Sequence, residues 1–185
     1  GSAGVIRLAA GAGGGLSIRN SSSGTLINNG LISAESATNT LNIATTAATN
    51  NGVLRAAGGT LTVGPRLGNF SSATGTLTGG SYQSSGTGDL QLVNITIQRL
   101  AASFSLTGAD ARIRGFVLGV PNPLLTGDIV IDAGGDVTAM GGAVVTLSSL
   151  NNQGTLTVGV GSAVNTTAHW PPPGRFLSAS AGRPW

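Results

Sequence analysis

Short stretches of alternating apolar and polar residues recur along the chain, and each one follows a turn rich in Gly or Asn. The clearest pair is residues 27–34 (INNGLISA) and 49–56 (TNNGVLRA), whose glycines lie 22 residues apart. A degenerate third copy follows at residues 74–79. Alternation with a period of two predicts a β-strand with one buried face, and Asn-Gly supplies the positive φ of a tight turn.

A second kind of unit has a glycine followed at once by an alternating strand. Its copies are residues 59–63, 80–83, 88–92, 127–132 and 154–158. No stretch of a dozen residues carries apolar positions at helical spacing without an interrupting Gly, Asn or β-branched run. The chain is therefore predicted to be all-β.

The spacing of the turns favours one β architecture over the others. Strands of this length also suit a sandwich or barrel, but those folds have no reason to repeat one turn at a fixed interval. A coil that stacks on itself does, because each turn must lie above the last. We predict a single-stranded parallel β-helix of about 22 residues per coil, which gives roughly eight coils.

This arrangement assigns residues to the inside and to the corners. The predicted inward positions are Leu31, Leu54, Leu61, Leu77, Leu90, Leu92, Ile95, Ile97, Ile129, Ile131 and Leu156. The corner asparagines predicted to stack and bond to one another are Asn28, Asn29, Asn50, Asn51, Asn151 and Asn152.

The tail of the chain has a different composition. Residues 169–185 hold both tryptophans, the only histidine and four of the seven prolines. Successive prolines lack backbone donors and cannot extend a strand ladder. We expect a solenoid domain at 1–168 and a Pro- and Trp-containing tail or cap at 169–185. The alternative is that the tail docks onto a neighbour, with Trp170, Phe176 and Trp185 at a subunit junction.

Composition narrows the class of protein. Only 8% of the residues are charged and aromatics make up 4%, so polarity comes from Ser, Thr and Asn. This is typical of extracellular or cell-surface proteins. The chain has no cysteine, which excludes disulfides and thiolate metal sites. The N-terminus lacks the organisation of a signal peptide, so we expect a mature segment or a piece of a longer protein.

Charge and hydropathy argue against two kinds of partner. The net charge is +3 and all nine basic residues are scattered arginines, whereas nucleic-acid binding needs clustered cations. No window approaches the length of apolar sequence that a membrane-spanning helix requires. We therefore expect neither nucleic-acid binding nor a membrane span.

The Asn-Asn-Gly turns and the Gly-Gly-Thr-Leu-Thr-Val stretch at 58–63 resemble the passenger regions of autotransporter and filamentous-haemagglutinin-like bacterial surface proteins. The resemblance covers about residues 24–165. It implies a right-handed β-helix exported to a bacterial surface, where it serves as a stalk or an adhesive face. It implies no catalytic residues.

The residues offer little for catalysis or metal binding. Asp128 and Asp132 are about 13 Å apart along one strand, too far for a glycosidase pair. The only histidine lies in the tail, which leaves no convincing serine triad or zinc site. We predict no catalytic residue, no metal and no cofactor.

Two surface patterns, one of arginines and one of threonines, allow either a binding role or no role beyond the fold. Arg112 and Arg114 lie on one strand face and, with Arg99 on a nearby coil, would contact a sulfate, phosphate or acidic sugar. The plain interpretation is a solvated outer face. Three Thr-x-Thr pairs would form a flat threonine array if stacked in register, or they reflect β-propensity alone.

The sequence thus predicts a non-catalytic extracellular structural or adhesive solenoid. Open ends with unpaired strand edges favour head-to-tail self-association into filaments or a surface stalk. The alternatives are a module that binds glycans on a host surface and, third, a carbohydrate-active β-helix enzyme.

Overall fold

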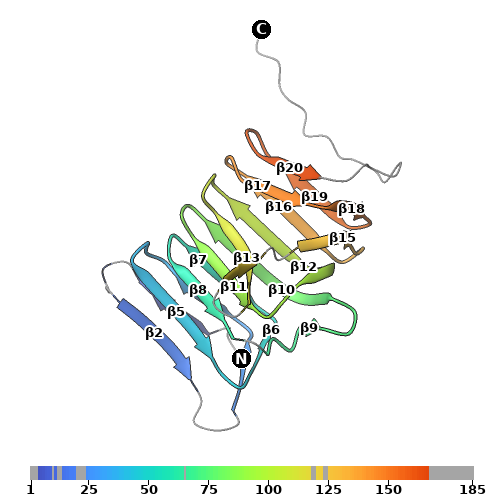
Figure 1. The fold of residues 1–185 in the computed structure, drawn as a ribbon. Coiled ribbons are helices and arrows are strands. Elements are labelled where there is room, and N and C mark those ends of the chain that lie inside the picture. The colour runs from blue at the N-terminus through green and yellow to red at the C-terminus, as the bar shows by residue number, and fades with distance from the viewer. Residues whose placement is uncertain are drawn as a thin grey trace.

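A computed structural model describes residues 4–9, 11, 14–19, 24–64, 66–117, 120–122 and 125–166. In this part of the chain every regular element is a β-strand, and none is a helix. The strands stack as flat rungs from one end of the molecule to the other (Figure 1). The predicted junction residues Trp170, Phe176 and Trp185, with the rest of the tail, lie outside the described residues.

Two walls carry most of the strands. The main wall follows the order β1 (Val5–Leu8), β4 (Leu31–Ala34), β7 (Val53–Ala57), β10 (Thr76–Ser85), β12 (Ile97–Thr107), β15 (Leu125–Ile131) and β18 (Ser149–Asn152), and to it belong β9 (Phe70–Ser71), β16 (Asp136–Met140) and β19 (Thr155–Val158). The second wall contains β2 (Gly14–Arg19), β5 (Asn39–Ala44), β8 (Thr60–Val63), β11 (Asp89–Val93), β13 (Arg112–Val117) and β14 (Val120–Asn122). Two smaller pairs are β3 (Thr25–Asn28) with β6 (Ala47–Asn50), and β17 (Val144–Leu147) with β20 (Ala163–Thr166).

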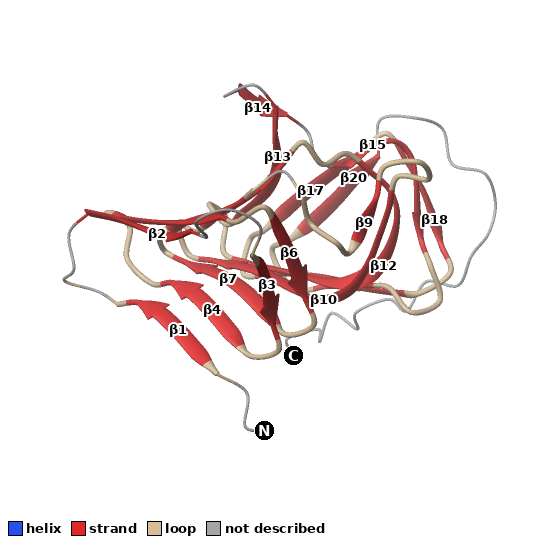
Figure 2. Ribbon diagram, turned by 90° about the horizontal axis from the view of Figure 1, so that it is seen from below, coloured by secondary structure: helices blue, strands red, loops and turns tan. Residues whose placement is uncertain are grey.

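Strand pairing confirms the predicted fold class. Nearly every strand pairs in parallel with a strand one coil away, so the backbone hydrogen bonds run along the stack. Seen from below, β1, β4 and β7 follow one another in one layer, and β2 lies in the layer opposite them (Figure 2). The coils number about six, roughly 23 residues apart, and the prediction of eight was therefore too high.

The two clearest repeats stack as predicted. Asn28 aligns with Asn50, and Leu31 with Val53. The Asn28 Nδ2 donates to Asn50 Oδ1 at 2.8 Å, and the Asn51 Nδ2 donates to Asn29 Oδ1 at 3.0 Å. A Cβ on Gly52 would lie 2.2 Å from the Gly30 carbonyl oxygen, so this corner requires glycine because the rungs approach so closely.

The third repeat was assigned to the wrong segment. Residues 81–85, not 74–79, pair with β7, and residues 89–92, not 80–83, pair with β8. The coil that leads from β7 to β10 is longer because residues 66–80 form an extended corner, in which Leu67 bridges to Ala48 and β9 folds back onto β10. We call this segment the long corner, and the corners at 28–30 and 50–52 the short corners.

The interior is filled by aligned columns of apolar side chains. Ile32, Leu54, Tyr82, Phe104 and Val137 form one column in the main wall, and all are buried. Burying one such aliphatic side chain stabilises the fold by about 2 kcal/mol. Tyr82 and Phe104 meet edge to face, with ring centroids 5.5 Å apart.

Most of the predicted inward positions are correct. Leu54, Leu61, Leu77, Leu90, Leu92, Ile95, Ile97, Ile129 and Ile131 are buried, and Leu156 is half-buried against the core. Leu31 is wrong, because it is half-buried whereas Ile32 is 1% exposed and aligns with the buried Leu54. A strand alternates its faces, so moving its start by one residue exchanges inside and outside.

Candidate functional site

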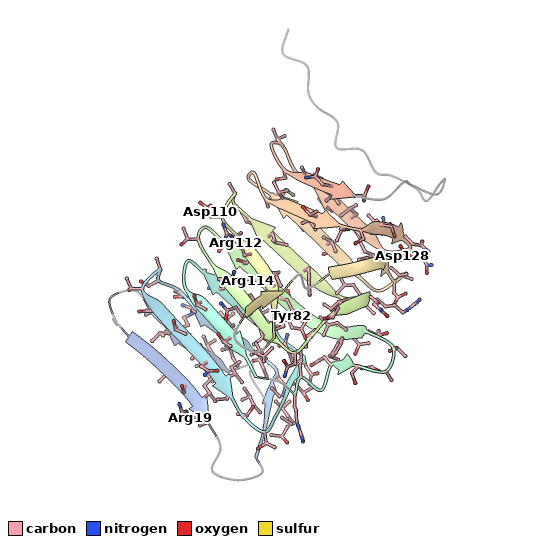
Figure 3. The ribbon with its side chains drawn as sticks, in the orientation of Figure 1. Arg19, Tyr82, Asp110, Arg112, Arg114 and Asp128 are labelled. Carbon is pink, nitrogen blue, oxygen red and sulfur yellow. The ribbon has the colours of Figure 1, made fainter. Side chains whose placement is uncertain are left out.

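The three arginines predicted to form one anion-binding group do not come together. Arg99 lies on β12 in the main wall, whereas Arg112 and Arg114 lie on β13 in the second wall. Arg99 forms an ion pair with Asp132. Arg114 forms a bidentate pair with Asp89, with Nε 2.8 Å from Oδ1. Arg112 is exposed beside Arg114 (Figure 3) and forms no ion pair with any acid among the described residues.

The acidic residues are dispersed over the surface. Asp110 and Asp128 lie at opposite edges of the ribbon (Figure 3). Asp128 accepts from Ser149, and Glu35 lies between Arg7 and Arg55 at 3.3 and 2.8 Å. Among the described residues no three His, Cys, Asp or Glu side chains gather closely enough to hold a metal ion.

The Thr-x-Thr pairs do not form one array. Thr60 and Thr62 stack between Thr40 and Asn42 on one side and Asp89 and Gln91 on the other. The other two pairs belong to the main wall, in strands β10 and β19 that do not pair with each other. The threonines therefore alternate with other polar groups.

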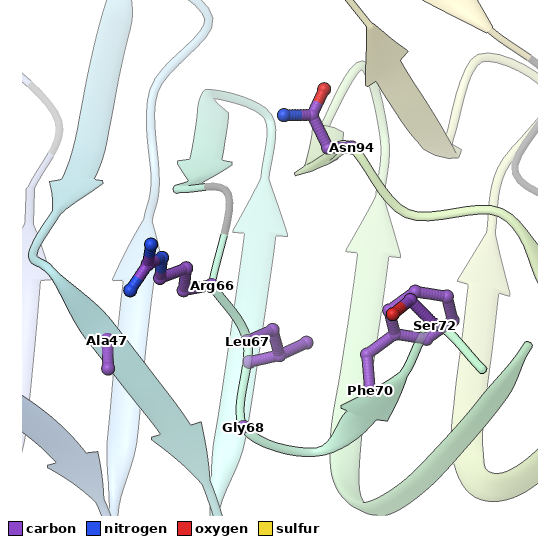
Figure 4. A pocket seen from close by; sticks show the side chains of 7 residues that line it. All are labelled: Ala47, Arg66, Leu67, Gly68, Phe70, Ser72 and Asn94. Carbon is purple, nitrogen blue, oxygen red and sulfur yellow. The ribbon is translucent and has the colours of Figure 1, made fainter.

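The long corner creates a hollow on the side of the stack. It has a volume of about 300 Å³, and we call it the flank pocket (Figure 4). Its lining residues are Ala47, Arg66, Leu67, Gly68, Phe70, Ser72 and Asn94. They come from three coils, because Ala47 begins β6, residues 66–72 belong to the long corner, and Asn94 follows β11.

One buried asparagine holds the long corner in place. Asn69 Oδ1 accepts from the Asn50 backbone N–H at 2.6 Å, and its Nδ2 donates to the carbonyls of Asn50 and Thr78 at 3.0 and 2.8 Å. The backbone of Ala48 bonds to the carbonyl of Arg66 and to the N–H of Gly68. Phe70 and Ser71 then pair antiparallel with Leu77 and Thr76, and Phe70 also lines the pocket. The pocket is thus tied to the solenoid at several points.

The rim of the flank pocket combines a cation with two neutral polar groups. Arg66 is exposed, and no acid among the described residues forms an ion pair with it. Asn94 has a φ of 57°, the only positive value of a non-glycine residue in the described chain. Figure 4 shows Arg66 and Ala47 on the left of the lining residues, Phe70 and Ser72 on the right, and Asn94 at the top.

Sequence reasoning missed this pocket. The available signal was the failure of the repeat between residues 64 and 80, where a Pro, an Arg and an Asn replace the regular turn. Repeat proteins accommodate insertions at corners, and such insertions commonly carry binding residues.

The first described rung exposes residues that belong to the interior columns. Ile6 aligns with Ile32 and is 38% exposed, and Leu16 aligns with Leu41 and is 43% exposed. At the opposite end Leu156 and Val164 are only half-buried. Within the described residues, β1 and β2 each have a free edge on the side away from the stack.

Tyr82 carries a polar hydroxyl into the core. Its side chain is fully buried, and its hydroxyl makes no hydrogen bond of normal geometry within the described residues. Burial raises the pKa of Tyr82 well above its ordinary value, and the nearby Asn50 side chain offsets this only in part. The hydroxyl therefore stays protonated and serves packing.

In comparisons with known proteins, no family model, no curated protein and no solved structure matches the chain. The described residues contain no helix of the length and hydropathy that a membrane crossing needs.

Proposed function

We propose that this protein is a non-catalytic structural solenoid that assembles end to end, forming a filament or a stalk on a bacterial surface. The observation that carries the proposal is the exposure of interior-column residues on the first described rung, Ile6 and Leu16. A free rung edge offers unpaired backbone groups and apolar surface together, which favours the addition of another strand.

The first and the last described rungs match each other in register. The column that starts at Ile6 ends at Leu156, and the column that starts at Leu8 ends at Val158. If β19 of one molecule paired with β1 of the next, Leu156 would meet Ile6 and Val158 would meet Leu8. Both columns would continue without interruption.

The second side of the coil supports the same junction. β13 follows β12 after Thr107, and β17 follows β16 after Met140, each through a turn that contains glycine. Because Thr107 aligns with Met140, the two connections start at the same position of successive coils. β20 pairs with β17 and places Val164 over Val145. A next molecule continuing this wall would bring its Leu16 to Val164.

Electrostatics adds little resistance to such a junction. The only charged residue on β1 is Arg7, which already neighbours Glu35 at 3.3 Å, and β19 carries no charge. With 8% of residues charged, neighbouring molecules repel weakly.

The proposal is tested by electron microscopy and light scattering over a concentration series. We expect linear assemblies that lengthen with concentration, with the apparent mass rising accordingly. A charge at Ile6 (Ile6→Asp) would abolish assembly because it would be buried at the junction. The matched control is Ile27→Asp, since Ile27 is 58% exposed on β3 and lies off the interior columns. A wild-type chain that stays monomeric throughout would refute the proposal.

The extracellular location rests on composition and on the resemblance to exported bacterial solenoids. The chain combines low charge with abundant Ser, Thr and Asn. Protease treatment of intact cells that express the full gene product tests the location. Rapid digestion supports surface exposure, whereas protection until the cells are lysed would contradict it.

A further inference from the structure

We propose that the flank pocket binds an acidic sugar residue, a uronate, through Arg66. This goes beyond end-to-end assembly, because the pocket lies on the side of the stack and exists in a single molecule. Among the described residues no acid lines it, so the Arg66 guanidinium is the only formal charge in the described lining. A guanidinium forms paired hydrogen bonds with a carboxylate, which makes a carboxylate-bearing ligand the best match in charge and shape.

The rest of the lining favours a sugar over a simple anion. Leu67 is 4% exposed and forms an apolar floor with Ala47, and the half-buried ring of Phe70 stands at the side. The C–H face of a pyranose ring packs on such apolar and aromatic surface. Ser72 and Asn94 provide a hydroxyl and an amide at the rim, which can donate to or accept from sugar hydroxyls.

The size and the isolation of the pocket define the ligand further. A volume of about 300 Å³ lies at the lower end of small-molecule sites and suits one sugar ring with its substituents. The described lining holds no second arginine, which disfavours a polyphosphate or nucleic acid because such ligands need several cations. A single uronate within a longer acidic polysaccharide fits both limits.

The pocket is also preorganised. Asn69 fixes the backbone between Arg66 and Phe70 through three hydrogen bonds. Asn94 is held in a conformation that non-glycine residues rarely adopt. A rigid site loses less entropy when a ligand binds.

The experiment is a titration of the ¹⁵N-labelled chain with glucuronate, glucose and sulfate, followed by NMR. We expect shifts confined to residues 66–72 and around Asn94, with a Kd on the order of 1 mM for glucuronate. Glucose and sulfate alone should bind at least several-fold more weakly. Equal binding of sulfate would refute sugar recognition, and no shift with glucuronate at roughly 50 mM would refute the site altogether.

Two variants locate the binding. Arg66→Gln should weaken glucuronate binding roughly tenfold or more, because the charged hydrogen bonds are lost. Arg112→Gln is the matched control, since Arg112 is also an exposed arginine without an ion pair to a described acid, and it should bind as the wild type does. If both variants lose binding equally, the anion is held by net charge and the inference is wrong.

A third variant separates binding from folding. Asn94→Gly removes the amide at a position whose φ of 57° suits glycine. The unfolding free energy should not fall, while glucuronate affinity should drop a few-fold. Unchanged affinity in a folded Asn94→Gly chain would remove Asn94 from the site.

Discussion

The short corners and the long corner satisfy the buried polar groups at the turns of the solenoid in two different ways. At the short corners, Asn28 and Asn50 stack directly, and the Nδ2 of each also bonds to a carbonyl of a following coil, that of Val53 or Ser81. At the long corner the chain makes an excursion, yet Asn69 bonds to the backbone of Asn50. The solenoid thus tolerates an insertion at a corner when a side chain of the insertion forms hydrogen bonds with the buried backbone groups of the preceding coil.

The difference has a functional consequence. The short corners leave no room for a ligand, since even a Cβ at Gly52 would meet backbone at 2.2 Å. The long corner borders a hollow of about 300 Å³. Regular repetition gives stiffness and spacing, and the break in the repeat gives a place for recognition.

The largest effect is expected at the short corner. Gly52→Ala forces a Cβ against the Gly30 backbone, which cannot move without disturbing the next rung. We expect a loss of about 3 kcal/mol in unfolding free energy by urea denaturation. Gly86→Ala is the control, because its φ is +61° but nothing lies within 4 Å, and it should cost only about 1 kcal/mol. Equal losses would contradict the close approach of the rungs.

A somewhat smaller effect is expected at the long corner. Asn69→Ala leaves the buried N–H and carbonyl of Asn50 without their partners. Unsatisfied buried groups of this kind cost roughly 2 kcal/mol. The same variant should broaden the NMR signals of residues 66–72. A stable variant with an unchanged spectrum would show that Asn69 does not organise the corner.

An effect of intermediate size is expected from Tyr82, which should make the unfolding free energy depend on pH. Tyr82 lies in the coil that follows the long corner, and its raised pKa means that the folded state holds its proton more tightly than the unfolded state. Stability is therefore full below about pH 10 and falls as the pH rises further, by about 1.4 kcal/mol per pH unit. The chain has one Tyr, no Cys and only Arg among its basic residues, so few other groups titrate there.

The control for this pH dependence is Tyr82→Phe. Its unfolding free energy should stay flat between about pH 10 and 12, because the titrating hydroxyl is gone. Parallel curves for the wild type and the variant would contradict the burial of Tyr82.

The smallest effect is expected at the outer asparagine ladder. Asn51 donates to Asn29 at 3.0 Å, but this bond is exposed to water. Asn51→Ala should cost no more than about 0.5 kcal/mol, against a larger loss for Asn50→Ala, whose side chain is buried. A loss at Asn51 as large as at Asn50 would mean that the outer ladder matters as much as the inner one.

Much of the fold follows from the sequence because the repeated turns are explicit. Two Asn-Asn-Gly turns 22 residues apart define a coil, and the alternation after each turn defines a wall. The prediction failed for Leu31 and for residues 74–83, where one residue of phase or one insertion changes the register. Register depends on which rungs pair in space, and a single degenerate sequence does not encode that locally.

The candidate site was much harder to predict. Arg114 finds Asp89 and Arg99 finds Asp132, each pair more than 20 residues apart in sequence. Such pairs depend on the length of the coil at that point, so the acidic partners of these arginines could not be identified from the sequence alone. Arg66 was not predicted as a site residue because its neighbours in the pocket, Ala47 and Asn94, lie on other coils.

End-to-end pairing of β19 with β1 is tested most directly by engineered cysteines in a chain that has none. Mixing Val5→Cys with Thr155→Cys under mild oxidation should give a disulfide-linked dimer, because paired parallel strands lie about 4.8 Å apart, within disulfide range. Arg7→Cys with Thr155→Cys is the control, since a shift of two residues separates the Cα atoms by about 8 Å. Efficient linking of the first pair alone is the predicted result. Linking of both pairs to the same extent, or of neither, would contradict the junction.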